Sequence, residues 1–311
     1  MKTYSLKRLN TKHDFLVNYA DNKLKVLGPH TTTTFFLKNI ENKISIEADL
    51  KEIDQETLEV AMEAAFNTSF EACELILNNQ DSILRADFFE RQNIWNVSTR
   101  LDNVEYVQSG SVTHPVRPQV EAGKILYSRY VEAINASVQF RVIDPVVDLD
   151  VFHQWHNQPR VAEFWEMPFS KEELLAYINK SLSDSHQLPV IAEINGVPAG
   201  YFEIYWTKED RLGPYYDSAN YDRGFHLLVG NTDFLGFKNT DALLKSATHF
   251  IFLDDERSTK IMGEPRYDNE KILKYVLSFK SWRKIKEFDF PHKRAALLEC
   301  DRNLFFKGHY L

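Results

Sequence analysis

The segment of residues 201–268 decides the fold, because it joins a histidine-bearing strand to a loop and a helix start. It contains YFEIYWTKEDRLGPYY (201–216), DRGFHLLVG (222–230) and NTDFLGFKNTDALLKS (231–246), and it ends within GEPRYDN (263–269). His226 lies in an apolar run that is typical of a strand. Beyond Gly236 a helix is predicted to begin at Asn239, and the backbone N–H groups of such a helix start can hold an anion. The segment therefore predicts an anion site beside a strand that carries a titratable side chain.

The elements around this segment follow a regular order. A strand at 136–143 precedes helices at 148–165 and 170–184, the second of which opens with Ser170 and Glu173 in capping-box spacing. Two further strands are joined by Asn195-Gly196, which is a strong hairpin signal. With the later strands and helices, the order is β-α-α-β-β-β-α-β-α-β-β. This order predicts a mixed α/β (α+β) domain.

The first hundred residues have a different pattern. Short β-prone runs alternate with turn residues, which predicts a small antiparallel sheet. Apolar residues at three-to-four spacing predict a helix over 55–77. The stretch GSVTHPVRPQVEAG (110–123) is rich in prolines and glycines and indicates an interdomain connection. We therefore expect an N-terminal domain with its linker at 1–136 and a second domain at 137–311.

Composition excludes several classes of protein. The chain has 311 residues and a net charge of -8, which argues against a nucleic-acid binder. It has two cysteines, Cys73 and Cys300, without metal-ligand spacing. His153 and His156 have i, i+3 spacing but no apparent third ligand, so we expect no metal. No apolar run reaches the ~20 residues that span a bilayer, and the first residues do not resemble a signal core. These features predict a cytoplasmic protein without a membrane span.

Four motifs together resemble the GNAT acyl-CoA transferases, and within them the siderophore hydroxylysine acetyltransferases of the aerobactin type. The resemblance is dense from about Phe140 to Phe306 and sparse before that. The motifs and the family patterns that they resemble are DRGFHLLVG (222–230, DRG-x-HLLVG), EPRYDN (264–269, EPR-x-DN), FHQWHNQPRVAEFWE (152–166, F-x-x-W-x-x-x-P-R-V-x-x-FWE) and KEFDFPHKR (286–294). The resemblance implies a GNAT fold whose smaller N-terminal domain is a degenerate GNAT-like half without a cofactor site. That half would cover one side of an acceptor tunnel or brace the catalytic domain.

Two residues are candidates for catalysis. His226 is the best candidate for a base, because a neutral imidazole can accept a proton near neutral pH and the resemblance places a catalytic group on this strand. A buried core histidine is the alternative. Asp268 lies in the EPR-x-DN motif before a predicted helix, so it is either a catalytic or acceptor-orienting carboxylate or an N-cap.

The cofactor candidates follow from what an acyl-CoA needs. Gly236, Lys238, Asn239 and Thr240 are expected to hold the pyrophosphate at the helix start. Most GNAT proteins carry Q/R-x-x-G-x-G/A in this loop, whereas Asp233, Gly236 and Lys238 occupy the corresponding places here. A glycine that serves only the turn is the alternative.

The thioester is expected at the strand that precedes this loop. Backbone N–H groups around Leu228 and Val229 would polarise its carbonyl.

The acceptor candidates lie in three motifs. Two tryptophans could wall a slot for an aliphatic arm, with core packing as the alternative. Four residues on or beside the neighbouring strands could hold the charged end of the acceptor. The full set is Trp155, Trp165, Glu203, Tyr205, Asp222 and Arg223.

The resemblance implies an N-acetyltransferase of hydroxamate siderophore biosynthesis. It would move acetyl from acetyl-CoA to the hydroxylamine nitrogen of N(6)-hydroxylysine, N-hydroxyputrescine or N-hydroxycadaverine by direct attack, without an acyl-enzyme. Two alternatives stand beside it: an ordinary GNAT amine acetyltransferase, and a non-catalytic acyl-CoA-binding scaffold. The choice among the acceptors, the choice between an acetyl and a succinyl donor, and assembly as a homo-oligomer all remain open.

Overall fold

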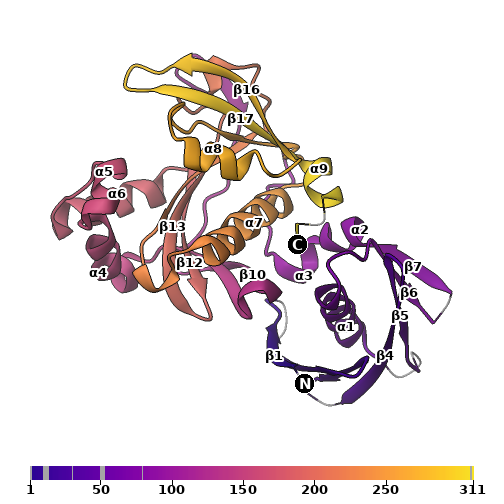
Figure 1. Cartoon of the computed structure of the whole chain (residues 1–311). Coiled ribbons are helices and arrows are strands. Elements are labelled where there is room, and N and C mark those ends of the chain that lie inside the picture. The colour runs from indigo at the N-terminus through magenta and orange to yellow at the C-terminus, as the bar shows by residue number, and fades with distance from the viewer. Residues whose placement is uncertain (1, 10–13, 30, 50–52, 79, 309) are drawn as a thin grey trace.

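The described residues form two large β-sheets, which pack against each other through shared helices, and a third sheet of two strands (Figure 1). A computed structural model describes residues 2–9, 14–29, 31–49, 53–78, 80–308 and 310–311. The indigo and purple N-terminal third of the chain builds one sheet, and the orange and yellow part lies around the other (Figure 1).

The first sheet has seven strands among the described residues, in the order β1-β2-β3-β4-β5-β6-β7. Neighbours are antiparallel except β5 and β6, which are parallel because helix α1 connects them. The strands are β1 (Lys2–Lys7), β2 (Asp14–Ala20), β3 (Lys23–Leu27), β4 (Thr32–Ile40), β5 (Lys43–Glu47), β6 (Glu74–Leu77) and β7 (Asp81–Leu84).

The second sheet has eight strands within the described ranges, in the order β10-β11-β12-β13-β14-β15-β17-β16. Only β14 and β15 pair in parallel there, and they are joined through helix α7. The strands are β10 (Ile125–Val131), β11 (Ala136–Val142), β12 (Gln187–Ile194), β13 (Val197–Trp206), β14 (Arg223–Val229), β15 (Lys260–Gly263), β16 (Trp282–Asp289) and β17 (Arg294–Asp301). The predicted α/β order from 136 onward is confirmed.

Helices cover both faces of the second sheet. Ile191 of β12 packs with α4 and α6, whereas its neighbours Val190 and Ala192 pack with α7, because successive side chains of a strand point to opposite faces. The helices are α1 (Gln55–Thr68), α2 (Arg85–Phe89), α3 (Gln92–Trp95), α4 (Pro145–His156), α5 (Pro159–Trp165), α6 (Lys171–Ser183), α7 (Phe237–Asp254), α8 (Glu270–Val276) and α9 (Arg302–Lys307).

Two local predictions are confirmed. Ser170 and Glu173 form both hydrogen bonds of a capping box at the start of α6. Asn195 and Gly196 take φ values of 49° and 77° in the turn between β12 and β13, as a two-residue hairpin of the primed type requires.

The predicted helix over 55–77 is wrong in its second half. Helix α1 ends at Thr68, and Ser69 is extended. The Cys73 N–H then donates to the Asn42 carbonyl, which brings the following residues into β6 beside β5. Pairing with a distant strand therefore overrides an apolar spacing that, read locally, continues the helix.

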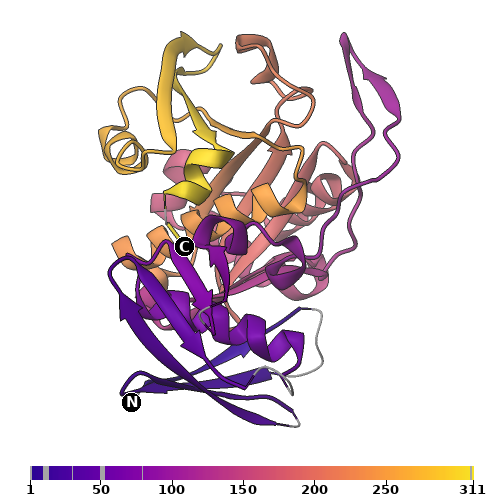
Figure 2. The same cartoon turned by 90° about the vertical axis from the view of Figure 1, so that its right-hand side faces the viewer.

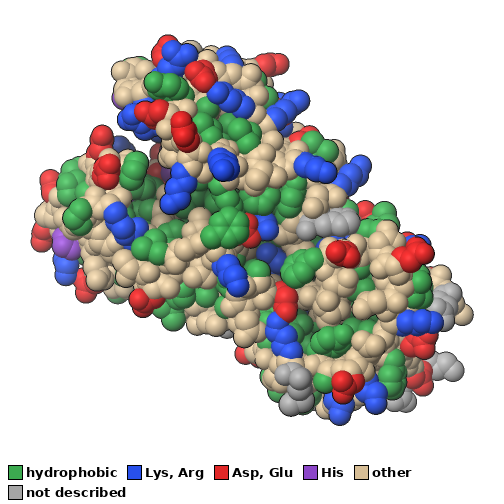
Figure 3. Space-filling model, viewed as in Figure 1, with side chains coloured by type: hydrophobic (Ala, Val, Ile, Leu, Met, Phe, Trp, Pro, Cys, Tyr) green, Lys and Arg blue, Asp and Glu red, His purple; other side chains and the backbone are tan. Residues whose placement is uncertain are grey.

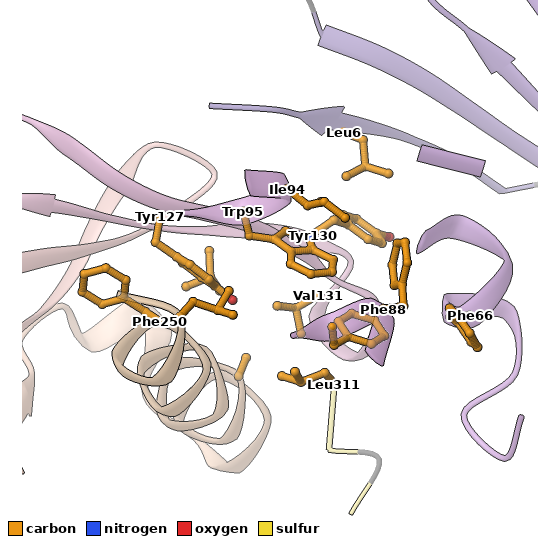
Figure 4. Close-up of a cluster of buried hydrophobic side chains, with 14 of the residues drawn as sticks. Leu6, Phe66, Phe88, Ile94, Trp95, Tyr127, Tyr130, Val131, Phe250 and Leu311 are labelled. Atoms are coloured by element: carbon orange, nitrogen blue, oxygen red, sulfur yellow. The ribbon is translucent and has the colours of Figure 1, made fainter. Parts of the chain in front are cut away.

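The two sheets share one hydrophobic core. Trp95 of α3 lies in the same cluster as Tyr127 of β10 and Phe250 of α7 (Figure 4), and its ring centroid is 5.1 Å from that of His249 of α7. Tyr4 of β1 stacks on Tyr130 of β10 with ring centroids 4.0 Å apart. β10 precedes the predicted boundary at 136 but pairs with β11, so the second sheet begins earlier in the chain than that boundary.

The stretch predicted to be an interdomain connection (110–123) begins inside a hairpin and contains its second strand. Strands β8 (Tyr106–Ser109) and β9 (Val112–Pro115) form a separate two-stranded sheet. Figure 2 shows this hairpin projecting from the body of the molecule. Arg117, just after it, anchors its base by donating to both carboxylate oxygens of Glu209, at 2.6 and 2.7 Å.

Candidate active site

The second sheet opens between β14 and β15. The two strands pair only at Arg223 with Ile261 and Gly224 with Met262. Beyond these pairs lies a cavity of about 1200 Å³, which is lined by parts of α5, β13, β14, α7, β15, α8 and β17. The molecule is hollowed on this face between the part that carries β16 and β17 and the part that carries α4 to α6 (Figure 3). The opening of the sheet therefore provides the room for a ligand.

His226 lies on β14 at this opening, between two carboxylates. Its Nδ1 is 3.3 Å from Glu203 Oε2, and its Nε2 is 3.1 Å from Glu264 Oε1. Burial alone would lower the pKa of His226, but the hydrogen bonds and charges of Glu203 and Glu264 outweigh burial and raise it to about 9. The imidazole is therefore protonated at neutral pH in the unliganded site, unlike the neutral base that the sequence suggested.

Both carboxylates beside His226 are ionised. Burial would raise the pKa of Glu203, and the hydrogen bond and charge of His226 lower it below its ordinary value. Burial would likewise raise the pKa of Glu264, and the hydrogen bond and charge of His226 lower it well below its ordinary value. Tyr177 and Tyr201 donate to Glu203 Oε1, and Tyr201 does so at 3.2 Å. These bonds fix an anion–cation–anion unit in the wall of the cavity.

Glu264 is the functional candidate that sequence reasoning missed. Its Oε2 accepts from Tyr205 Oη at 3.2 Å, and its Oε1 faces His226. Glu264 is the first residue of the EPR-x-DN motif, but the motif alone does not indicate which of its two carboxylates, Glu264 or Asp268, meets the histidine.

Asp268 lines the cavity but does not contact His226. Its carboxylate accepts two hydrogen bonds from Arg266, at 3.0 and 2.8 Å, and 46% of its side chain is exposed. The hydrogen bond from Arg266 lowers the pKa of Asp268. Asn269, one residue later, caps α8 by accepting from the Ile272 N–H. The N-cap interpretation of Asp268 is therefore wrong.

The backbone of β14 offers a donor at the opening. The Asp222 carbonyl and the Gly230 N–H both bond on the β13 side, and alternate residues of a strand point to opposite neighbours. The N–H of Leu228 therefore faces β13, whereas the N–H of Val229 faces the opening. The Val229 carbonyl already accepts from Arg160 at 2.8 Å. Of the two predicted polarising groups, Val229 is the one whose N–H points away from β13, although neither residue is among those that line the cavity.

The helix start next to β14 is open to an anion. Helix α7 begins at Phe237, two residues before the predicted start, and Gly236 caps it with a φ of 125° that L side chains rarely adopt. The N–H of Thr240 donates to the Gly236 carbonyl at 3.1 Å and is therefore engaged. The N–H groups of Phe237, Lys238 and Asn239 have no intrahelical partner, as in any first turn. Lys238 is exposed beside them.

Three predicted acceptor residues lie at or just behind the cavity. Trp165 and Glu203 line it. Tyr205 is buried behind His226, with ring centroids 4.9 Å apart, and acts on the cavity through its hydrogen bond to Glu264.

The other three predicted acceptor residues do not line the cavity. Trp155 is buried beneath Gly230, where an added Cβ would lie 2.0 Å from the indole ring. Asp222 is buried and accepts from Tyr216. Arg223 is buried and donates to Asp254 at 3.1 Å. Their partners are inside the fold, so core packing explains them better than substrate contact does.

The described residues show neither a membrane-spanning helix nor a metal-binding cluster. No described helix is long and apolar enough to cross a membrane. Among the same residues, no group of three His, Cys, Asp or Glu side chains is arranged to hold a metal ion.

The fold agrees with comparisons to known proteins. Residues 144–290 match the model of the acetyltransferase (GNAT) domain. The chain is 36% identical to the N(6)-hydroxylysine O-acetyltransferase of Escherichia coli, over 72% of this chain and 73% of the relative. It is 40% identical to the N(5)-hydroxyornithine:cis-anhydromevalonyl coenzyme A-N(5)-transacylase of Beauveria bassiana, over 62% of this chain and 43% of the relative.

A solved structure shares the fold. The crystal structure of an uncharacterized protein from Bacillus halodurans matches 61% of this chain and 96% of its own, with a TM-score of 0.56 and 28% identity. The chain belongs to the GNAT acetyltransferase family. Within that family it is an acyl-CoA-dependent acyltransferase, related to enzymes named for hydroxylysine and hydroxyornithine.

Proposed function

We propose that this protein transfers an acetyl group from acetyl-CoA to the hydroxylamine nitrogen of an N-hydroxylated lysine or diamine. The product is a hydroxamate, an oxygen ligand for ferric iron. The observation that carries the proposal is the Glu203–His226–Glu264 unit at the open edge of the sheet. The names of the relatives support a hydroxylated side-chain nitrogen as the acceptor.

The donor fits along β14 and α7. The free N–H groups of Phe237, Lys238 and Asn239 would bind the pyrophosphate, because a helix start favours negative charge. The Val229 N–H, which faces the opening, would donate to the thioester oxygen as negative charge develops there.

The acceptor nitrogen attacks the thioester carbon directly, so that an N–C bond forms and the C–S bond breaks. A hydroxylamine is largely unprotonated near neutral pH, so the proton to be removed is that of the tetrahedral adduct. We assign its removal to a carboxylate beside His226, while the His226 imidazolium protonates the departing CoA sulfur. The existing hydrogen bond returns the proton to the imidazole, and the net result is transfer of one proton from nitrogen to sulfur.

A thiol-release assay tests the proposal. Acetyl-CoA is offered with N(6)-hydroxylysine, N-hydroxyputrescine, N-hydroxycadaverine or unmodified lysine, and hydroxamate is detected as its ferric complex. We expect hydroxamate from at least one hydroxylated acceptor and far slower turnover of lysine. Equal turnover of lysine would indicate an ordinary amine acetyltransferase. A thiol released without hydroxamate would indicate attack by oxygen, as the name of the Escherichia coli relative states.

Calorimetry with acetyl-CoA distinguishes a non-catalytic scaffold from an enzyme. An acyl-CoA-binding scaffold would bind acetyl-CoA without turnover on any acceptor, and a scaffold of another kind would not bind it.

A further inference from the structure

The motif KEFDFPHKR (286–294) has no role in the chemistry above, yet its turn lies at the cavity. The Phe290 N–H donates to the Lys293 carbonyl at 2.8 Å, which closes the turn between β16 and β17. His292 and Lys293 in this turn both line the cavity. Strand pairing, the simpler interpretation of the motif, explains its two flanks but not the placement of these two side chains at the cavity.

Two cationic side chains and a histidine surround one aromatic ring there, and burial and the neighbouring cations lower the pKa of His292. The Arg211 Cζ lies 5.7 Å and the Lys293 Nζ 5.6 Å from the ring centroid of Phe290. The His292 ring stacks on the same ring at 5.4 Å, with an angle of 22°. We call Arg211, His292 and Lys293 the cation cluster. Because Arg211 comes from the loop after β13, two distant segments converge to build it.

The cationic side chains at this place outnumber the carboxylates that contact them. Glu264 Oε1 is 3.4 Å from Arg211 Nη2 and 3.6 Å from Lys293 Nζ, and the same oxygen is the partner of His226 Nε2. Burial and then Arg211 lower the pKa of Lys293, and Glu264 offsets this only in part. Two carboxylates, Glu203 and Glu264, thus face the three cations His226, Arg211 and Lys293, and an anion would offset the remaining positive charge.

We propose that the cation cluster binds the carboxylate of the acceptor, so that the acceptor is an amino acid with a hydroxylated side-chain nitrogen rather than a decarboxylated diamine. This inference rests on the proposed function. Glu264 joins the two ends of the acceptor site, because its Oε1 lies 3.1 Å from His226 Nε2 and 3.4 Å from Arg211 Nη2. An aliphatic arm that runs past Glu264 would bring its hydroxylamine to His226 and its carboxylate to Arg211.

The geometry favours a carboxylate over the phosphates of CoA at this place. Arg211 contacts Glu264 through one nitrogen, and 51% of its side chain is exposed, so its planar fork is accessible to a second carboxylate. The start of α7 is not part of the cavity wall that carries the cluster. The phosphates therefore have their own site, and Glu166, which also lines the cavity, is available for an acceptor ammonium group.

The test crosses two variants with two acceptors that differ only in the carboxylate. Arg211→Gln and His292→Gln are assayed with N(6)-hydroxylysine and with N-hydroxycadaverine, and Arg283→Gln, an exposed arginine on β16, is the matched control. Wild-type protein is expected to prefer hydroxylysine in kcat/KM. Arg211→Gln should lower kcat/KM for hydroxylysine about 10- to 100-fold, the range for one charged hydrogen-bonding group, and leave hydroxycadaverine within about threefold. His292→Gln should act in the same direction but less.

Other results would overturn the assignment. Equal losses on both acceptors would show that the cations act only through Glu264. A wild-type preference for hydroxycadaverine would also overturn it while leaving N-acylation intact. Weaker acetyl-CoA binding by Arg211→Gln in calorimetry would assign the cluster to phosphate. If neither acceptor is turned over although acetyl-CoA binds, the proposed function itself fails, and the carboxylate assignment fails with it.

Discussion

The two sheets contain the same β-α-β unit, but it is closed in one and open in the other. In the N-terminal sheet, β5 and β6 flank α1 and pair at four positions, from Lys43 with Glu74 to Ile46 with Leu77. In the second sheet, β14 and β15 flank α7 and pair at two positions before they separate. The separation leaves room for the cavity, which His226 lines. Both halves carry the topology, but only the second has the opening that acyl transfer needs.

The starts of α1 and α7 also differ, because a side chain of the protein caps only the first of the two. Asp54 caps α1, and its carboxylate accepts from the Thr57 N–H at 2.8 Å, so the protein's own anion occupies that site. Gly236 caps α7 without any side-chain hydrogen bond, which leaves the first N–H groups to a ligand. The bracing role of the N-terminal half and its lack of a cofactor site stay predictions.

The largest effect is expected when the imidazole at the opening is removed. His226→Ala should lower kcat/KM by roughly 10²–10⁴, the range for loss of a positioned proton-transfer group, and leave acetyl-CoA affinity nearly unchanged. His153→Ala is the matched control, since His153 does not line the cavity. Steady-state kinetics and calorimetry measure the two effects. Activity within twofold of wild type would remove His226 from the mechanism.

A pH profile sharpens the role of Glu264. Because a protonated His226 with a pKa of about 9 acts as the acid, activity should fall as pH rises through that value. Glu264→Gln removes one of the two carboxylates that raise the pKa, so the alkaline limb should move to lower pH, and kcat/KM should fall by about 10–10². An activity that instead rises steadily towards pH 9 would show that neutral imidazole is the active form.

Charge reversal at the open helix start should have a moderate effect. Lys238→Glu is expected to weaken acetyl-CoA binding by about 1–2 kcal/mol, because it places a negative charge near phosphate. Lys25→Glu, an exposed change on β3 of the closed half, should leave binding unchanged. Calorimetry on both variants is the measurement. Equal affinities would show that the phosphates bind elsewhere.

The smallest effect is expected at Asp268. Its ion pair with Arg266 is largely exposed and screened by solvent, so Asp268→Asn should lower kcat/KM less than about fivefold. Thermal stability should not change, because Asn269 and not Asp268 caps α8. A loss of turnover beyond 10²-fold at constant melting temperature would restore the catalytic role that the EPR-x-DN motif implies.

Local signals in the sequence predicted what local chemistry determines. The hairpin at Asn195-Gly196 and the capping box at Ser170 depend on neighbouring residues and were predicted correctly. The strand that carries His226 and the helix after Gly236 were also predicted. The helix begins at Phe237, two residues before its predicted start at Asn239.

Long-range pairing could not be predicted from the same signals. The pattern of polar residues does not tell which carboxylate meets His226, and so Glu264 was passed over for Asp268. It likewise gives no sign that Arg223 turns inward to Asp254 or that Trp155 packs under Gly230. The end of α1 at Thr68 depends on β6 pairing with β5, which is a tertiary contact.

Amide hydrogen exchange with and without acetyl-CoA tests the comparison of the two halves most directly. Acetyl-CoA should slow exchange at Val229 and at Phe237, Lys238 and Asn239, where the open unit presents unpaired N–H groups. Exchange at the start of α1, where Asp54 already caps the helix, should not change. Protection at the start of α1, or none at the start of α7, would contradict the account.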